Sequence, residues 1–183
     1  MKTFQFSTKI VCIGGKAQNG KDTTAGFLKE HLESLGKKVL IAHQADLLKN
    51  MARDMFGWDG KKDEKGRHLL QYLGTDVIRK RDPDFWVDHL VRSFSALDDV
   101  WDVVLVPDTR FPNEIEKFKE AGFETTYIRI HRPNFKSPLT EEQQKHKSEI
   151  ALDDYKFDML VYNDGTLEDL KKQTASLAEW LIQ

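Results

Sequence analysis

A glycine- and lysine-rich segment near the start of the sequence has the residue types and spacing of a phosphate site. It reads Gly15-Lys16-Ala17-Gln18-Asn19-Gly20-Lys21-Asp22-Thr23-Thr24, between a β-branched run and a helical pattern. Glycines let the backbone wrap closely around an anion, and successive N–H groups at a helix N-terminus attract phosphate oxygens. Lys21 would reach the β- and γ-phosphates as a point charge. We therefore expect residues 15–24 to bind phosphate, the alternative being a glycine turn that binds nothing.

An apolar run farther along the chain delivers a carboxylate and an arginine. Residues 103–107 read VVLVP, and Asp108 and Arg110 follow them. Ligands of an open parallel sheet bind at the C-terminal ends of its strands, so Asp108 can hold Mg²⁺ through water, with Thr23 as a second candidate. The alternative for Asp108 is a cap on a helix that begins after Pro112. Arg110 has a fork suited to phosphate, and a surface ion pair is its alternative.

Asp22 stands where a serine or threonine usually follows the lysine of a phosphate loop, and Thr23 comes one position later. Asp22 is expected to favour the helix N-terminus rather than to take part in chemistry. The displaced threonine resembles a variant found in nucleoside monophosphate kinases. The ordered set GKAQNGKDTTA, QADLLK, LLQYLGTDVIR, DTRFPNE, HKSE and FDMLVYNDGTLEDL resembles the deoxynucleoside monophosphate kinases of tailed phages and their bacterial relatives. The resemblance implies transfer of the γ-phosphate of ATP to a deoxynucleoside 5′-monophosphate with Mg²⁺, in the host cytoplasm, with a homodimer as a possibility.

A kinase also needs an acceptor site and a lid, and the same motifs supply candidates for both. The expected acceptor-binding residues are Asp46, Lys49, Gly74, Asp76, Arg79, Trp86 and Arg110. Arg79 is the candidate for the acceptor phosphate, while Asp76 and Trp86 can contact sugar and base. Structural roles are the alternatives: an N-cap for Asp46, a favourable charge at a helix C-terminus for Arg79, and core packing for Trp86. Arg132 begins the polar segment after a predicted strand, and we expect it to act as the catalytic lid arginine beside Lys21, Asp108 and Arg110.

Alternating strand and helix patterns must position these residues. Strands are expected at 9–13, 38–43, 103–106, 125–130 and 157–162, and helices at 22–35, 46–56, 68–80, 85–97, 113–121 and 166–182. The charged stretch 61–67 is expected to be a mobile loop. Such alternation predicts a mainly parallel five-stranded sheet in a three-layer α/β P-loop NTPase fold. We expect one kinase domain over 1–183, with a helical acceptor-binding insert at about 45–100 and a lid at about 131–148.

Composition limits the other classes of protein. The chain has 183 residues, with 28 Lys and Arg against 30 Asp and Glu, and so lacks the basic excess of a nucleic-acid-coating protein. Its single cysteine, Cys12, excludes an internal disulfide and favours a reducing, cytoplasmic compartment. The sequence shows no secretory signal and no run of about 20 apolar residues, so no membrane association is expected.

Two other functions fit parts of the pattern. A kinase for another phosphorylated metabolite, of the dephospho-coenzyme A or phosphomevalonate type, would use the same sheet and phosphate loop. A nucleotide-dependent ATPase or switch would use the loop to control a partner. The arginine-bearing helical insert and the polar lid favour an acceptor site, and hence a kinase, over the switch.

Overall fold

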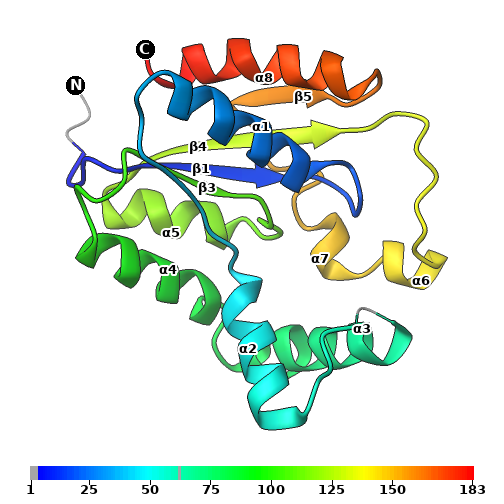
Figure 1. The fold of residues 1–183 in the computed structure, drawn as a ribbon. Helices are drawn as coiled ribbons and strands as arrows, with labels where there is room; N and C mark the ends of the chain where they lie inside the picture. The colour runs from blue at the N-terminus through cyan, green and yellow to red at the C-terminus, as the bar shows by residue number, and fades with distance from the viewer. Residues whose placement is uncertain (1–3, 62) are drawn as a thin grey trace.

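Five parallel strands form the centre of the protein in a computed structural model, which describes residues 4–61 and 63–183 (Figure 1). They are β1 Lys9–Gly14, β2 Val39–Ile41, β3 Val103–Val106, β4 Glu124–His131 and β5 Met159–Tyr162. Their order across the sheet is β2-β3-β1-β4-β5, and every pairing between neighbours is parallel. The predicted five-stranded parallel sheet is therefore confirmed.

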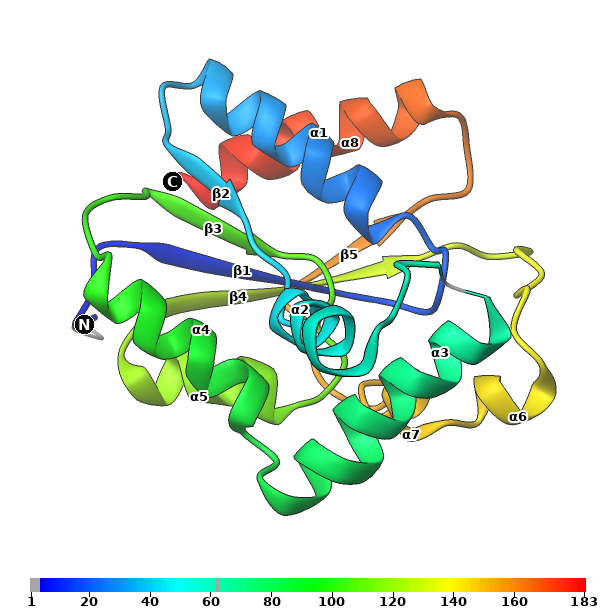
Figure 2. The same ribbon diagram turned by 60° about the horizontal axis from the view of Figure 1, so that its bottom comes forward.

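Helices cover both faces of this sheet and complete three layers (Figure 2). One face packs against α1 Lys21–Ser34 and α8 Leu167–Leu181, and the other against α4 Phe85–Ala96 and α5 Asn113–Ala121. Side chains of β1 alternate between the layers: Val11 and Ile13 join the α1 and α8 core, while Ile10 and Cys12 join the α4 and α5 core. All four are fully buried, which explains why the strand reads as an uninterrupted apolar run.

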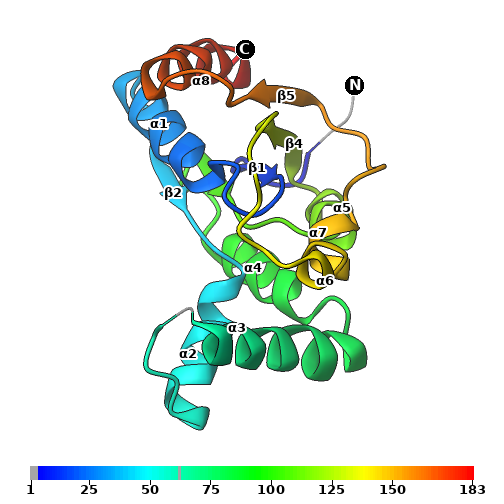
Figure 3. The same cartoon turned by 90° about the vertical axis from the view of Figure 1, so that its right-hand side faces the viewer.

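A group of helices between β2 and β3 in sequence lies on the side of the sheet away from α1 and α8 and reaches toward the carboxyl ends of the strands (Figure 1, Figure 3). It comprises α2 Ala45–Phe56, α3 Glu64–Gln71 and the π-helix η1 Tyr72–Arg79. A small separate core of Ala52, Trp58 and Leu73 holds the group together. Two short helices, α6 Glu141–Gln144 and α7 Lys147–Ile150, follow β4 and lie at the same end of the sheet.

The expected mobile loop at 61–67 is wrong for residues 64–67, which are helical, whereas Lys61 and Asp63 lie outside any helix or strand and position 62 lies outside the described residues. Helix α3 begins at Glu64 because the side chain of Asp63 accepts a hydrogen bond from the Gly66 N–H, at 2.8 Å. Asp63 is therefore an N-cap that stands within a run of charged residues. The helix expected at 68–80 therefore begins earlier, at Glu64, and it changes from α to π geometry at Tyr72.

No helix in the described ranges, 4–61 and 63–183, combines the length and the apolar character needed to cross a membrane. The other predicted helices and strands agree with the structure to within about two residues at each end.

Candidate active site

The phosphate loop joins β1 to α1 and folds around the side chain of Lys21. Gly15 and Gly20 have φ angles of 144° and 95°, which side chains with a Cβ rarely adopt. A Cβ on Gly15 would also lie 2.5 Å from the carbonyl oxygen of Ile130. The Lys21 ammonium donates to the carbonyls of Gly15 and Lys16, both at 2.9 Å. The loop therefore surrounds the Lys21 ammonium with its own carbonyl groups, and the contact of Lys21 with phosphate stays a prediction.

The environment of Lys21 weakens its hold on a proton. Its residue is 7% exposed, and burial lowers the pKa of its ammonium to about 8, with the positive charge of Arg110 acting in the same direction. The carboxylates of Glu149, Asp22 and Asp108 oppose that shift. A phosphate bound beside Lys21 would raise this pKa again, because an anion favours the protonated form.

Neighbouring side chains support the loop through hydrogen bonds to its carbonyl groups. The hydroxyl of the buried Thr24 donates to the Gly20 carbonyl at 2.9 Å, so it supports the loop from within α1. The Asn163 amide, from the turn after β5, donates to the Asn19 carbonyl at 3.0 Å. Sequence reasoning did not assign this role to Asn163, since the contact joins residues far apart in the chain. Thr23 is exposed.

Asp22 contacts a histidine at the end of the neighbouring strand. The imidazole of His43 lies 2.9 Å from the Asp22 carboxylate, and this hydrogen bond raises the pKa of His43. Asp22 thus joins the start of α1 to the segment after β2. The interpretation of Asp22 as structural agrees with this contact.

Asp108 follows β3 and is held at the C-terminal edge of the sheet. Its two carboxylate oxygens accept the backbone N–H groups of Gln44 and Ala45, at 3.1 and 2.9 Å. Burial raises the pKa of this carboxyl. Asp108 is therefore a cap for α2, so the alternative of a cap on the helix after Pro112 was wrong.

Glu114 stabilises the start of α5 instead. Its carboxylate accepts the N–H groups of Arg110 at 2.6 Å and Phe111 at 3.1 Å. The same carboxylate pairs with the Arg79 guanidinium at 2.5 Å, with the two side chains 3% and 14% exposed. Burial raises the pKa of Glu114, and Arg79 opposes the shift. This buried pair was not predicted, because its partners are 35 positions apart.

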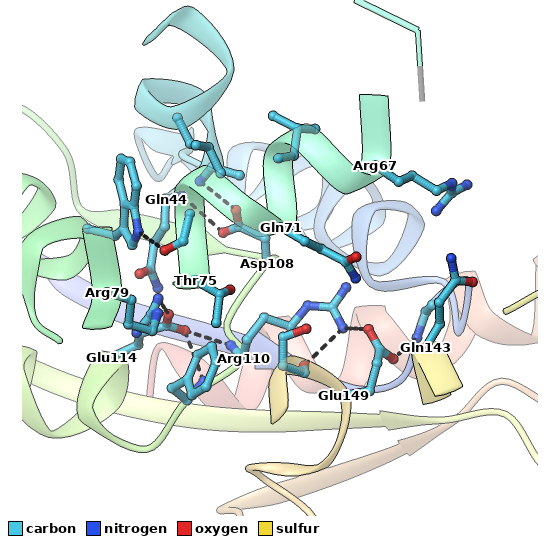
Figure 4. Close-up of a pocket in the computed structure, with 18 of the residues that line it drawn as sticks. Gln44, Arg67, Gln71, Thr75, Arg79, Asp108, Arg110, Glu114, Gln143 and Glu149 are labelled. Atoms are coloured by element: carbon cyan, nitrogen blue, oxygen red, sulfur yellow. Dashed lines mark hydrogen bonds and ion pairs between the residues drawn. The ribbon is translucent and has the colours of Figure 1, made fainter. Parts of the chain in front are cut away.

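A cavity of about 290 Å³ opens between the sheet edge, the helices after β2 and the segment around α6 and α7 (Figure 4). Four of the seven expected acceptor-binding residues line it: Gly74, Arg79, Trp86 and Arg110. Asp108 and Ala17 line it too, so the cavity reaches the phosphate loop. Lining residues that the sequence did not reveal include Gln44, Arg67, Gln71, Thr75, Glu114, Gln143 and Glu149.

The other three expected acceptor residues lie elsewhere. Asp76 is exposed, and its neighbour Thr75 lines the cavity in its place. Asp46 and Lys49 pair with each other at 2.7 Å, outside the lining that the described residues form. Because Gln44 is the residue before α2, Asp46 is not its N-cap. A contact of these three with an acceptor therefore stays a prediction.

Trp86 and Gly74 form a wall of the cavity. The indole N–H of Trp86 donates to the Gly74 carbonyl at 3.0 Å, and the tryptophan is 4% exposed. A Cβ on Gly74 would meet the side chain of Leu48 at 2.7 Å. The glycine therefore lets η1 pack closely against Leu48 of α2, whose side chain would have to shift to admit a Cβ.

Arg110 and the phosphate loop share one carboxylate, that of Glu149 at α7. Its Oε1 pairs with the Arg110 guanidinium, and its Oε2 accepts the Ala17 N–H at 3.0 Å. Lys16 makes a second contact between the loop and this segment. Its ammonium donates to the backbone carbonyl of Glu149 at 2.6 Å and pairs with the carboxylate of Asp153. The donors around Glu149 thus form an anion site at the junction of cavity and loop.

Arg132 does not lie at this junction. Its residue is exposed, and its guanidinium lies 4.4 Å from the ring centre of Phe135. The cavity receives its arginine side chains from Arg67, Arg79 and Arg110 in the described residues. The catalytic role of Arg132 therefore stays a prediction that requires movement of the lid.

The parallel sheet, its helical layers and the loop between β1 and α1 together define a three-layer α/β P-loop fold. The structure is similar to that of the APS kinase from Mycobacterium tuberculosis, solved in complex with AMPPNP and APS, with a TM-score of 0.57. The similarity covers 94% of this chain and 98% of that one at 15% sequence identity, so it concerns the fold alone.

Sequence similarity identifies the family. The sequence model of deoxynucleotide monophosphate kinases matches residues 57–174, and the chain belongs to this family. It is 33% identical to the deoxynucleotide monophosphate kinase of Enterobacteria phage T4 over 106 residues, which cover 57% of the chain and 41% of the phage protein.

Two viral proteins match over more of the chain. A putative deoxynucleotide monophosphate kinase of Acanthamoeba polyphaga mimivirus is 27% identical over 93% of the chain and 95% of its own length. The uncharacterized ORF77 protein of Ictalurid herpesvirus 1 is 29% identical over 86% of the chain. The matches span 64% of the herpesvirus protein and 41% of the T4 protein, so those relatives are considerably longer than the shared region.

Proposed function

We propose that the protein transfers the γ-phosphate of ATP to the 5′-phosphate of a deoxynucleoside monophosphate. Family membership supports this reaction. The observation that carries it is the anion site at Glu149, where an N–H group of the phosphate loop and the Arg110 guanidinium converge on one carboxylate. A donor phosphoryl group and an acceptor phosphate must meet at such a place for transfer to occur in line.

The residues divide between the two substrates. Residues 15–24 would surround the ATP phosphates, with Lys21 neutralising charge on the transferring group. The cavity, which extends from Ala17 to Trp86, would hold the acceptor with its phosphate toward Arg110. Its apolar lining includes Leu48, Leu70 and Phe111, which suits a nucleobase.

Magnesium fits the residues present. Each oxygen of Asp108 accepts one N–H, which leaves lone pairs for a water ligand. Among the described residues, no group of three His, Cys, Asp or Glu stands together as a ready-made metal site. Mg²⁺ is commonly bound through one or two carboxylates plus substrate phosphates, so Asp108 and Thr23 would complete a site brought by ATP. The ion would neutralise charge on the transferring phosphoryl group.

The organisation around this chemistry is part of the proposal. Residues 45–100 act as the acceptor-binding insert of one kinase domain, and 131–148 as a lid that carries Arg132 toward the phosphates. Closure of the lid would exclude water. A cytoplasmic location and a possible homodimer complete the proposal, with no nucleic-acid or membrane partner.

A coupled assay for ADP release tests the reaction. The panel contains the four deoxynucleoside monophosphates, their ribose forms, dephospho-coenzyme A, phosphomevalonate and a control without acceptor. We expect turnover with one or more deoxynucleotides and slow release of phosphate without an acceptor. Rapid ATP hydrolysis that is independent of any acceptor would instead assign the protein to the ATPase or switch class.

The Glu149→Gln substitution tests whether Glu149 occupies a phosphate position. The variant keeps the shape of the side chain and removes the charge that competes with phosphate for Arg110 and the Ala17 N–H. We expect the dissociation constant of the preferred deoxynucleotide to fall about tenfold, because charged hydrogen bonds are about twice as strong as neutral ones. Isothermal titration calorimetry without ATP measures it.

Glu142→Gln is the matched control, since Glu142 is exposed on α6. It should leave the affinity unchanged. Weaker binding by Glu149→Gln would mean that Glu149 positions Arg110 for the substrate, and the competition between carboxylate and phosphate would be refuted.

A further inference from the structure

The side chain of Gln44 is buried in the wall of the cavity without a hydrogen-bond partner. Its residue is 5% exposed, yet neither Nε2 nor Oε1 contacts a donor or acceptor among the described residues. Leaving such a group unpaired costs about 1–3 kcal/mol. An apolar side chain would avoid that cost at this position.

The backbone of Gln44 is fixed although its amide is unpaired. Its N–H donates to Asp108 at 3.1 Å, and the next N–H, that of Ala45, donates to the same carboxylate. Gln44 is therefore held between the end of β2 and the start of α2, with its side chain in the cavity lining. This arrangement presents one donor and one acceptor from a rigid support.

Polar side chains near Gln44 are already paired with the protein. Arg79 pairs with Glu114, whose carboxylate also accepts two backbone N–H groups. The Trp86 indole donates to the Gly74 carbonyl. Figure 4 shows Gln44 on the same side of the cavity as Arg79 and Glu114, while the side chain of Arg110 extends from beside Glu114 to Glu149 on the other side.

We propose that the Gln44 carboxamide hydrogen-bonds the edge of the acceptor's nucleobase through both of its polar atoms. The inference rests on the proposed function, which directs the acceptor phosphate to Arg110 and so its base to the Gln44 side. A phosphate offers only acceptors, whereas a base edge offers a donor beside an acceptor, as a carboxamide does. Rotation of the amide by half a turn exchanges its donor and acceptor, so one glutamine can serve bases of either pattern.

The Gln44→Met substitution tests the proposal because it keeps the length of the side chain and removes both polar atoms. Dissociation constants are measured by calorimetry for the four deoxynucleoside monophosphates and for 2-deoxyribose 5-phosphate, which lacks a base. We expect about 10-fold to 100-fold weaker binding of the nucleotides that the wild type binds, from the loss of two hydrogen bonds. Binding of 2-deoxyribose 5-phosphate should not change.

Thermal unfolding separates recognition from a structural role. An amide that is unpaired in the protein contributes no stability, so Gln44→Met should unfold at the wild-type temperature or above it. Gln173→Met is the matched control, because Gln173 lies on α8 and donates to the Tyr162 carbonyl. Its affinities should equal those of the wild type. Gln44→Asn, which retains the amide one methylene short, should lose affinity for the nucleotides only.

Three results would overturn the proposal: unchanged nucleotide affinity in Gln44→Met, an equal loss for 2-deoxyribose 5-phosphate, or a lower unfolding temperature in both Gln44 variants. The second would assign the amide to the sugar or to the shape of the cavity. A wild-type protein that neither binds nor phosphorylates any deoxynucleotide would refute the proposed function itself. The two failures are therefore distinguishable.

Discussion

Lys21→Ala should reduce phosphoryl transfer by about 10²-fold to 10³-fold, the usual effect of removing one charge contact to a transition state. The Lys21 ammonium lies within the loop that would surround the ATP phosphates, and no other lysine in residues 15–24 is buried with it. Steady-state kinetics with ATP and the preferred deoxynucleotide measure the loss. We expect it mainly in kcat, because charge on the transferring group develops in the transition state.

The control must allow for the structural contacts of Lys21. Since its ammonium also donates to Gly15 and Lys16, the substitution can loosen the loop. Lys21→Met retains the aliphatic stem but loses the same two hydrogen bonds, so thermal unfolding is measured for both variants, and both should show the same loss of activity. Lys29→Ala, which removes a lysine of α1 paired with Glu33, should retain full activity. Activity of Lys21→Met within a few-fold of the wild type would refute the assignment of the loop.

The sheet and its layers could be predicted because their signals are local. Residues 103–106 form an unbroken apolar run, and the structure makes them the fully buried strand β3. Helix α5 was predicted with its observed bounds, since Gly122 adopts the left-handed conformation that ends it. Alternation of such runs with helices specifies parallel pairing.

The start of α3 was missed, although the start of α2 was predicted to within one residue. The start of α3 depends on Asp63, inside a charged stretch that reads as a loop. This cap does not lie next to an apolar periodic pattern, which is the signal that predicts a helix start. The cap that Asp108 provides for α2 was also missed, because Asp108 follows a strand that is distant in sequence.

Within the candidate site, too, the residues that could be predicted are those whose conformation is set by the local sequence. The phosphate loop is one continuous segment with its own glycine geometry, so its place between β1 and α1 could be predicted from the sequence. Glu114, Gln44 and Glu149 were missed because each acquires its role through a partner or a cavity that the fold assembles. Glu149 belongs to the recognised HKSE motif, but its chemistry depends on Arg110 and Ala17, which are 39 and 132 positions away.

Arg79→Ala should lower the free energy of unfolding by about 3–5 kcal/mol, because it leaves a buried carboxylate without its counter-charge. Glu114 is 3% exposed and keeps only its backbone donors in the variant. Urea unfolding followed by fluorescence measures the change. Arg81→Ala is the matched control, since Arg81 is exposed two positions later, and it should change stability by less than about 0.5 kcal/mol.

The pH dependence identifies the cause of that loss. Burial raises the pKa of Glu114 in the folded protein, and Arg79 opposes the shift, so removing Arg79 raises this pKa further. A folded-state pKa above the unfolded value means that the folded protein binds the additional proton, and stability falls as the pH rises through the folded pKa. The loss of unfolding free energy caused by Arg79→Ala should therefore be smaller at about pH 5 than at about pH 8. Adding Glu114→Gln should remove that pH dependence, because the glutamine has no charge to bury. A deficit that is equal at both pH values would show that Arg79 stabilises the fold through its packing on Phe111 and not through its charge.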